Sequence, residues 1–312
     1  MIEAHNLTKR YGATTAVDDL SFEVRPGQVT GFLGPNGAGK STTLRMIMGL
    51  DAADAGSVSV LGHPYGKHRR PLFEVGALLD AKAIHGGRTA YNHLLCLAQS
   101  NGIERRRVDE VLELVGLTGV ANKRAGGFSL GMGQRLGIAA ALLGDPQVLL
   151  FDEPVNGLDP EGIVWIRNLM RAFASEGRTV LVSSHLMSEM ALTADHLIVI
   201  GRGRLIAATS VADFINASSQ NYVRVRTRQA APLVSLVRSR GGDASTDADG
   251  ALRVTGLDCV AVGELAAANS IVLHELVAQA PSLEEAFMEV TQESVDYHAD
   301  VADQYLTLAK GA

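Results

Sequence analysis

Two segments of the chain carry residues whose types and spacing suit phosphate chemistry. The first, GPNGAGKS at 34–41, fits the pattern G-x-x-x-x-G-K-[ST]. Glycines in such a loop let backbone N–H groups approach phosphate oxygens and form a nest for an anion. We expect Lys40 to reach the β- and γ-phosphates of a nucleotide and the Ser41 hydroxyl to bind Mg²⁺. The expected nucleotide-binding residues here are Gly34, Pro35, Asn36, Gly37, Ala38, Gly39, Lys40, Ser41 and Thr42.

The second segment is VLLFDE at 148–153, an apolar run that ends in Asp152 and Glu153. A buried strand that delivers two carboxylates to its C-terminal end suits a metal-dependent phosphate site. We expect Asp152 to hold Mg²⁺, usually through water, and Glu153 to polarise an attacking water as a general base. An isolated Asp-Glu pair is more often a solvated strand end, but the phosphate loop upstream favours the catalytic interpretation.

Regular elements must bring these two segments together. Apolar runs typical of buried strands occur at 28–33, 148–151, 179–184 and 196–200. Helices are predicted at 42–50 and 160–175, and a mostly helical stretch at 89–143 separates the two phosphate-binding segments. Alternation of strands and helices predicts a parallel sheet with helices packed around it.

The pattern changes in the last third of the chain. Strand, helix, two strands, helix and strand follow one another, and this order fits a small ferredoxin-like domain. We therefore predict one domain at 1–217, with a helical subdomain at about 86–143, and a small α+β domain at 218–302. A tail is predicted at 303–312. The small domain contains no catalytic constellation of residues.

Composition limits the classes of function. The chain has 312 residues and a formal net charge of −6, which argues against wholesale nucleic-acid binding, so no nucleic-acid partner is expected. Cys96 and Cys259 lie far apart and suit neither a metal site nor a disulfide framework. The sequence shows no apolar leader and no uninterrupted apolar run of about 18 residues, so a cytoplasmic protein that does not itself span a membrane is expected.

Together these motifs resemble the nucleotide-binding subunit of an ATP-binding-cassette (ABC) transporter. The segment FSLGMGQR at 128–135 is similar to the family signature LSGGQ, with Ser129 and Gly131 matching and Leu130 and Met132 departing from the usual Gly and Gln. The resemblance implies that the Ser129 hydroxyl and the Gly131 amide meet the γ-phosphate held by a partner subunit. Ser129 also suits a helix N-cap, and both roles can hold.

The resemblance extends to four more residues. Asp159, in NGLD, matches the aspartate of the D-loop, and His185, in SSHLMSE, matches a switch histidine that contacts the γ-phosphate. Tyr11 matches the aromatic residue that stacks on adenine, with a packed surface tyrosine as the alternative. Asp80 stands where the family has a glutamine that binds Mg²⁺ through water and senses the permease. Its negative charge leaves its role open.

The resemblance to this family implies a fold and an activity. The fold is an α/β P-loop NTPase with a mixed sheet core, an antiparallel β subdomain and a helical subdomain, here followed by the small α+β domain. The cofactors that the resemblance implies are ATP and Mg²⁺. The implied activity is ATP hydrolysis that powers a separate transmembrane permease on the inner face of the cell membrane, with export of a drug, antibiotic or lipid-like compound.

The resemblance also implies that two copies close head to tail around two ATP molecules. In that arrangement Lys40 and His185 of one copy face Ser129 and Gly131 of the other. Two alternatives are a soluble ATPase acting on ribosomes or DNA and a module that senses ATP without hydrolysing it. A single cassette with no heptad array disfavours the first, and the intact Glu153 and His185 disfavour the second.

Overall fold

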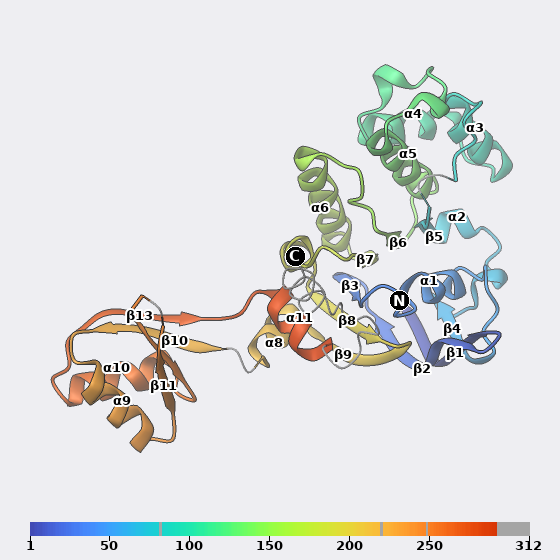
Figure 1. Ribbon diagram of the computed structural model, residues 1–312. Helices are drawn as coiled ribbons and strands as arrows, with labels where there is room; N and C mark the ends of the chain where they lie inside the picture. The colour runs from blue at the N-terminus through green and yellow to red at the C-terminus, as the bar shows by residue number, and fades with distance from the viewer. Residues whose placement is uncertain (81–82, 219–220, 248, 292–312) are drawn as a thin grey trace, which may run out of the picture. The chain divides into compact units, whose positions relative to one another are not determined.

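A computed structural model describes residues 1–80, 83–218, 221–247 and 249–291 (Figure 1). The described chain forms two compact units, one holding Met1–Ser210 with Val290 and Thr291, the other being Val211–Glu289. The limits predicted from the sequence, 1–217 and 218–302, remain a prediction. The predicted tail at 303–312 and the end of the predicted small domain lie outside the described residues.

A six-stranded sheet, in the order β5-β6-β7-β3-β8-β9, forms the centre of the larger unit. Its strands are β3 (Val29–Leu33), β5 (Val75–Leu78), β6 (Val148–Asp152), β7 (Thr179–Ser183), β8 (His196–Gly201) and β9 (Arg204–Ser210). All neighbours are parallel except β8 and β9, which form an antiparallel hairpin. Every residue of β3 and β7 is buried, and apart from Thr30, Thr179 and Ser183 both strands are apolar, as expected for central strands covered on both faces.

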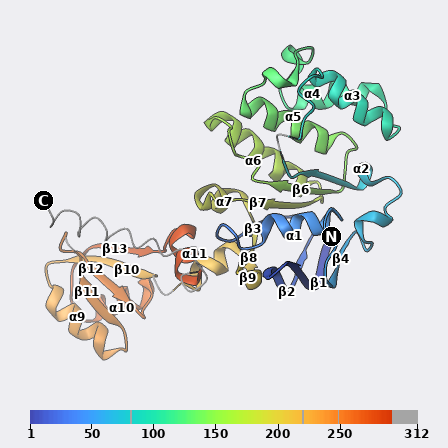
Figure 2. The same ribbon diagram turned by 45° about the vertical axis from the view of Figure 1, so that its right-hand side comes forward.

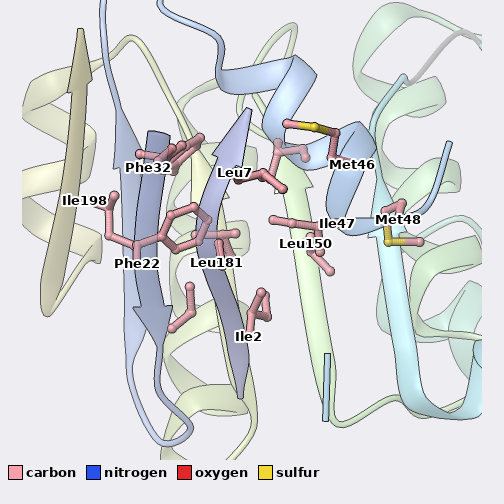
Figure 3. Packing of buried hydrophobic residues seen from close by; sticks show 14 of the residues in the cluster. Ile2, Leu7, Phe22, Phe32, Met46, Ile47, Met48, Leu150, Leu181 and Ile198 are labelled. Atoms are coloured by element: carbon pink, nitrogen blue, oxygen red, sulfur yellow. The ribbon is translucent and has the colours of Figure 1, made fainter. Parts of the chain in front are cut away.

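A three-stranded antiparallel sheet packs beside the first, in the order β2-β1-β4. Its strands are β1 (Ile2–Tyr11), β2 (Thr14–Val24) and β4 (Ala55–Val60). Figure 3 shows Phe22 of β2 and Phe32 of β3 in the shared core, with ring centroids 5.6 Å apart. Met46 and Ile47, the last two residues of the helix Lys40–Ile47, enter the same core and hold the end of that helix against the sheets.

Helices surround the sheets and form one separate group. They are α1 (Lys40–Ile47), α2 (Pro71–Glu74), α3 (Ala90–Ser100), α4 (Arg105–Leu114), α5 (Leu130–Leu142), α6 (Pro160–Ser175) and α7 (Met187–Thr193), with short 3₁₀ turns at Tyr65–Lys67, Thr118–Val120 and Ala125–Gly127. The group α3, α4 and α5 lies between β5 and β6 in the chain (Figure 2), and α5 packs against β5, where a Cβ atom at Gly137 would lie 2.6 Å from Leu78 Cδ1. The expected mixed sheet, antiparallel sheet and helical insert are thus confirmed.

The helix after the phosphate loop differs from the prediction. It begins at Lys40 rather than at residue 42, and it ends at Ile47 rather than at residue 50. Gly39, at φ +99°, forms the N-cap, and Gly49, at φ +63°, follows the C-cap. The loop glycine lets the helix start directly at the lysine, and the second glycine ends it because its left-handed backbone cannot continue a helix.

The smaller unit is an α+β structure. Its four-stranded antiparallel sheet has the order β11-β12-β10-β13. Its strands are β10 (Tyr222–Thr227), β11 (Asp243–Thr246), β12 (Leu252–Thr255) and β13 (Leu273–Gln279). The helices are α8 (Val211–Asn216), α9 (Ala230–Ser239), α10 (Cys259–Ala268) and α11 (Leu283–Thr291). Val223 and Val225 of β10 share a buried core with α9 and α10. Among the described residues, none of the helices combines the length and apolar character needed to cross a bilayer.

Two half-buried histidines predict a loss of stability in acid. Burial lowers the pKa of His93 and of His196, and Nδ1 of each ring is buried without a hydrogen-bond partner among the described residues. The unfolded chain binds protons at these rings where the folded chain does not. The free energy of unfolding should therefore fall as the pH drops below about 6.5.

Thermal unfolding from about pH 8 to about pH 5.5 measures this effect. Replacing His196 with Gln should flatten the pH dependence, and the same change at the exposed His274 serves as the matched control. An identical pH dependence in the wild-type protein and the His196→Gln variant would contradict the expectation.

Candidate nucleotide-binding and catalytic site

The loop between β3 and α1 has a backbone that requires glycine. Gly37 and Gly39 have φ angles of +81° and +99°. A Cβ atom at Gly39 would lie 2.3 Å from the carbonyl oxygen of Ala16, and one at Gly34 would lie 2.6 Å from that of Ile200. The loop is thus pressed against β2 and β8, and only glycine permits this close approach.

Lys40 is held inside its own loop. Its Nζ donates to the carbonyl oxygens of Gly34 at 2.6 Å and Pro35 at 3.2 Å. Burial lowers the pKa of the Lys40 ammonium, and the carboxylates of Glu153 and Asp152 act in the opposite direction. The two segments predicted to do phosphate chemistry are therefore close enough for their charges to interact.

Ser41 and Asp152 come together from segments far apart in the chain. The Ser41 hydroxyl donates to Asp152 Oδ2 at 2.9 Å, and the Ser183 hydroxyl donates to Oδ1 of the same carboxylate. A hydroxyl and a carboxylate are the hard oxygen ligands that Mg²⁺ prefers. No group of three or more His, Cys, Asp or Glu side chains able to hold a metal occurs in the described parts of the chain. Ser41 and Asp152 therefore fit a Mg²⁺ ion whose remaining ligands are phosphate oxygens and water.

Glu153 follows the end of β6 in an unusual conformation. Its φ of +51° is rare for a residue other than glycine. Its N–H donates to the Ser183 carbonyl oxygen at 3.2 Å, and its Oε2 lies 2.7 Å from Nδ1 of His185. The carboxylate is thus directed toward the imidazole, as expected for a base oriented by a neighbouring ring.

Lys40, Ser41, Asp152 and Glu153 lie in the wall of one cavity of about 660 Å³. Its walls are formed by Ala16, Asn36, Gly37, Ala38, Gly39, Lys40, Ser41, Thr42, Leu79, Asp80, Leu130, Gln134, Asp152, Glu153 and Asn156. Residues 36–42 of the phosphate loop, the Asp-Glu pair and Asp80 thus line the same cavity. Tyr11, Ser129, Gly131, Asp159 and His185 are not part of the cavity wall.

Comparison with known proteins identifies the family. Residues 17–156 match the protein family described as ABC transporter. The chain is 37% identical over 298 residues to an uncharacterized ABC transporter ATP-binding protein, YhcH, of Bacillus subtilis, across 94% of this chain and 97% of that protein. The chain belongs to the ABC transporter family. ATP is accordingly the nucleotide that this ABC protein binds and hydrolyses.

Two further likenesses support the assignment of this ABC protein. The bacitracin transport ATP-binding protein BcrA of Bacillus licheniformis is 38% identical to it over 259 residues, across 81% of this chain and 84% of BcrA. A bacterial ABC transporter cassette solved as a dimer is 25% identical, with a TM-score of 0.61, and aligns over 67% of this chain and 98% of that one. Residues 221–284, in the smaller unit, match a domain of unknown function, DUF8746.

Tyr11 of the ABC cassette lies at the surface near the cavity. Its side chain is 49% exposed, and its hydroxyl donates to Asp51 Oδ2 at 2.7 Å. Hydrogen bonds from Arg45 and from Tyr11 lower the pKa of Asp51 to about 2. The tyrosine is therefore held by Asp51 with much of its side chain open to solvent. This suits a ring that stacks on a base and equally suits a packed surface tyrosine.

The signature residues of the cassette begin α5. The Ser129 hydroxyl accepts a hydrogen bond from the Met132 N–H at 3.2 Å, as expected for an N-cap. Gly131 lies against the D-loop, where an added Cβ atom would come within 2.7 Å of the Gly157 carbonyl oxygen. The structure thus explains why glycine stands at position 131. It places both residues outside the wall of their own chain's cavity.

Asp159 and Asp80 occupy different settings in the cassette. Asp159 Oδ1 accepts from the Gly162 N–H at 2.9 Å and caps α6, so this side chain is engaged in a structural contact. Asp80 follows β5 and lines the cavity beside Leu79. Asp80 thus lines the same cavity as the phosphate loop, and its role there stays a prediction.

Three residues that the motif search missed also shape the site of this ABC protein. Ser183 holds the Asp152 carboxylate, and Asn156 and Gln134 line the cavity. Ser183 could have been found as a buried polar residue in an apolar strand. Gln134 could have been found because it lies four residues after Leu130 and therefore on the same helix face.

Proposed function

We propose that this chain is the ATP-hydrolysing subunit that powers a separate transmembrane permease, which exports an antibiotic, drug or lipid-like compound. The observation that carries the proposal is the convergence of Lys40, the Ser41–Asp152 hydrogen bond and Glu153 on one cavity. A binding module without turnover would need no base held beside the phosphate loop. The similarity to BcrA, which is named for bacitracin transport, supports an exporter of antibiotics.

The phosphate loop and Lys40 bind the phosphate groups. Backbone N–H groups of the loop point to the anion, and the helix dipole of α1 favours negative charge at its start. Lys40 leaves its contacts with Gly34 and Pro35 to donate to the β- and γ-phosphates. Ser41 Oγ and the Asp152 carboxylate would hold Mg²⁺, and Asp80 lines the same cavity. When bound, the metal neutralises the charge that develops on the phosphate oxygens.

Glu153 acts on the attacking water. Its carboxylate accepts a proton as the water oxygen attacks the γ-phosphorus, and the bond from that phosphorus to the β-γ bridging oxygen breaks to leave ADP and phosphate. His185, at 2.7 Å, keeps the Glu153 carboxylate oriented and contacts the γ-phosphate. Preorganised charges and N–H groups supply most of the stabilisation of the transition state.

The complete site requires two copies of the chain. Ser129 caps the start of α5 and Gly131 lies in its first turn, and the resemblance of this segment to the family signature supports their acting on the γ-phosphate held by a partner copy. The likeness to a cassette solved as a dimer supports the same arrangement. Tyr11 stacks on adenine at the edge of each site, and Asp159 lies where the two D-loops meet. We place the pair at the inner face of the cell membrane, bound to the permease.

Purification from the native host tests this proposal. When the tagged protein is extracted from membranes in mild detergent, a polytopic membrane protein should copurify with it in a fixed molar ratio of the two proteins. In reconstituted vesicles the complex should move a probe such as bacitracin only when ATP is hydrolysed, and Glu153→Gln should stop transport. Stimulation of the ATPase by ribosomes or DNA, with no effect of the permease, would overturn the proposal.

A further inference from the structure

Gln134 makes a contact that the proposed mechanism does not use. It lies in the second turn of α5 and is 3% exposed. Its Nε2 donates to the main-chain carbonyl oxygen of Glu153 at 3.2 Å. Burying an amide side chain without hydrogen bonds is costly, so this contact has a clear physical reason. It joins the signature helix to the residue proposed as the general base.

The hydrogen bond from Gln134 is made to a residue with a strained backbone conformation. Glu153 has a φ of +51°, which costs free energy for a residue with a side chain. Ser183 anchors its N–H, and the Asn156 N–H donates to its carbonyl oxygen at 3.2 Å within the same turn. Gln134 supplies the second hydrogen bond to this oxygen, from a different element. It therefore limits how far the peptide after Glu153 can rotate.

The start of α5 packs against the same segment. Leu130 lies so close to Gly157 that a Cβ atom there would meet the leucine Cγ at 2.4 Å, and Gly131 lies against the Gly157 carbonyl oxygen. Leu130 and Gln134 are four residues apart and both line the cavity. One face of α5 thus contacts the chain at both Glu153 and Gly157.

We propose that Gln134 is a positioning residue for ATP hydrolysis. It holds the Glu153 main chain so that the carboxylate is directed at the attacking water. Ser129 caps the helix that carries Gln134. When Ser129 binds the nucleotide held by a partner copy, the position of this helix also determines the orientation of Glu153 in its own chain. This inference rests on the proposed role of Glu153 as the base.

Two variants of the full-length protein test the proposal. Gln134→Met keeps the length of the side chain and removes the donor, and Gln134→Glu keeps the shape and presents an oxygen to the carbonyl. Each should lower the kcat for ATP hydrolysis by about tenfold or more. The KM for ATP and the affinity for ATP should stay at the wild-type values, because neither variant changes the phosphate loop. Gln99→Met, at an exposed position on α3, is the matched control.

The split between kcat and KM separates positioning from a structural role. A wild-type kcat in either variant would overturn the proposal, as would a joint loss of ATP affinity, kcat and thermal stability in both. The Glu153→Gln variant, measured beside them, separates the proposed role of Glu153 from the proposed role of Gln134. If Glu153→Gln hydrolyses ATP normally, the proposed base is wrong. If it is inactive while both Gln134 variants are fully active, only the role of Gln134 is wrong.

Discussion

Replacing Glu153 with Gln is expected to lower the rate of ATP hydrolysis by about 10²–10⁴-fold while ATP binding is retained. The amide keeps the size of the side chain and a hydrogen-bonding partner for His185, which lies 2.7 Å away, but it cannot accept the proton of the attacking water. Lys40, Ser41 and Asp152 stay in place to bind the nucleotide. Phosphate release measures the rate, and titration calorimetry with ATP in the presence of Mg²⁺ measures the affinity.

The same variant should accumulate as an ATP-dependent dimer, because closure occurs and the hydrolysis that reopens the pair does not. Size-exclusion chromatography with and without ATP detects the dimer. Glu113→Gln, on the exposed face of α4, is the control and should hydrolyse ATP at the wild-type rate. A Glu153→Gln protein that remains monomeric with ATP bound would count against the proposed cycle.

Replacing Lys40 with Ala should weaken ATP binding by about 10–100-fold, with hydrolysis lost at the same nucleotide concentration. Lys40 is the cation at the start of α1, and charge-assisted hydrogen bonds to phosphate are stronger than neutral ones. Its two present acceptors, the carbonyl oxygens of Gly34 and Pro35, are ordinary loop groups that a phosphate readily replaces. Titration calorimetry with ATP gives the change in affinity.

Lys123→Ala, at an exposed position, provides the matched control for the loss of one positive charge. Circular dichroism should show that the Lys40→Ala protein is folded, because the two hydrogen bonds that Lys40 Nζ donates go to carbonyl oxygens of its own loop. Wild-type affinity for ATP in Lys40→Ala would mean that the loop does not hold the phosphates.

The local motifs of the site could be predicted from sequence because each is encoded in a few neighbouring residues. The glycines of the loop are required by positive φ angles and close backbone contacts, and Lys40 follows them directly. Asp152 ends an apolar strand that is buried in the sheet. The limits of α1 were less well predicted, since the exact start depends on the conformation of Gly39. Periodicity gives the existence of a helix more reliably than its ends.

What the sequence by itself determined was the set of phosphate-binding residues, the apolar strands and the family they resemble. What only the tertiary structure decided was which of them meet. Ser41 and Asp152 are 111 residues apart, yet they share a hydrogen bond because β6 and β7 lie near β3 in a parallel sheet whose strand ends converge. The pairing of Asp152 with Ser183, and the reach of Gln134 to Glu153, depend on strand register and helix packing. Register and packing are set by the burial of the whole core, so no short pattern in the chain records them.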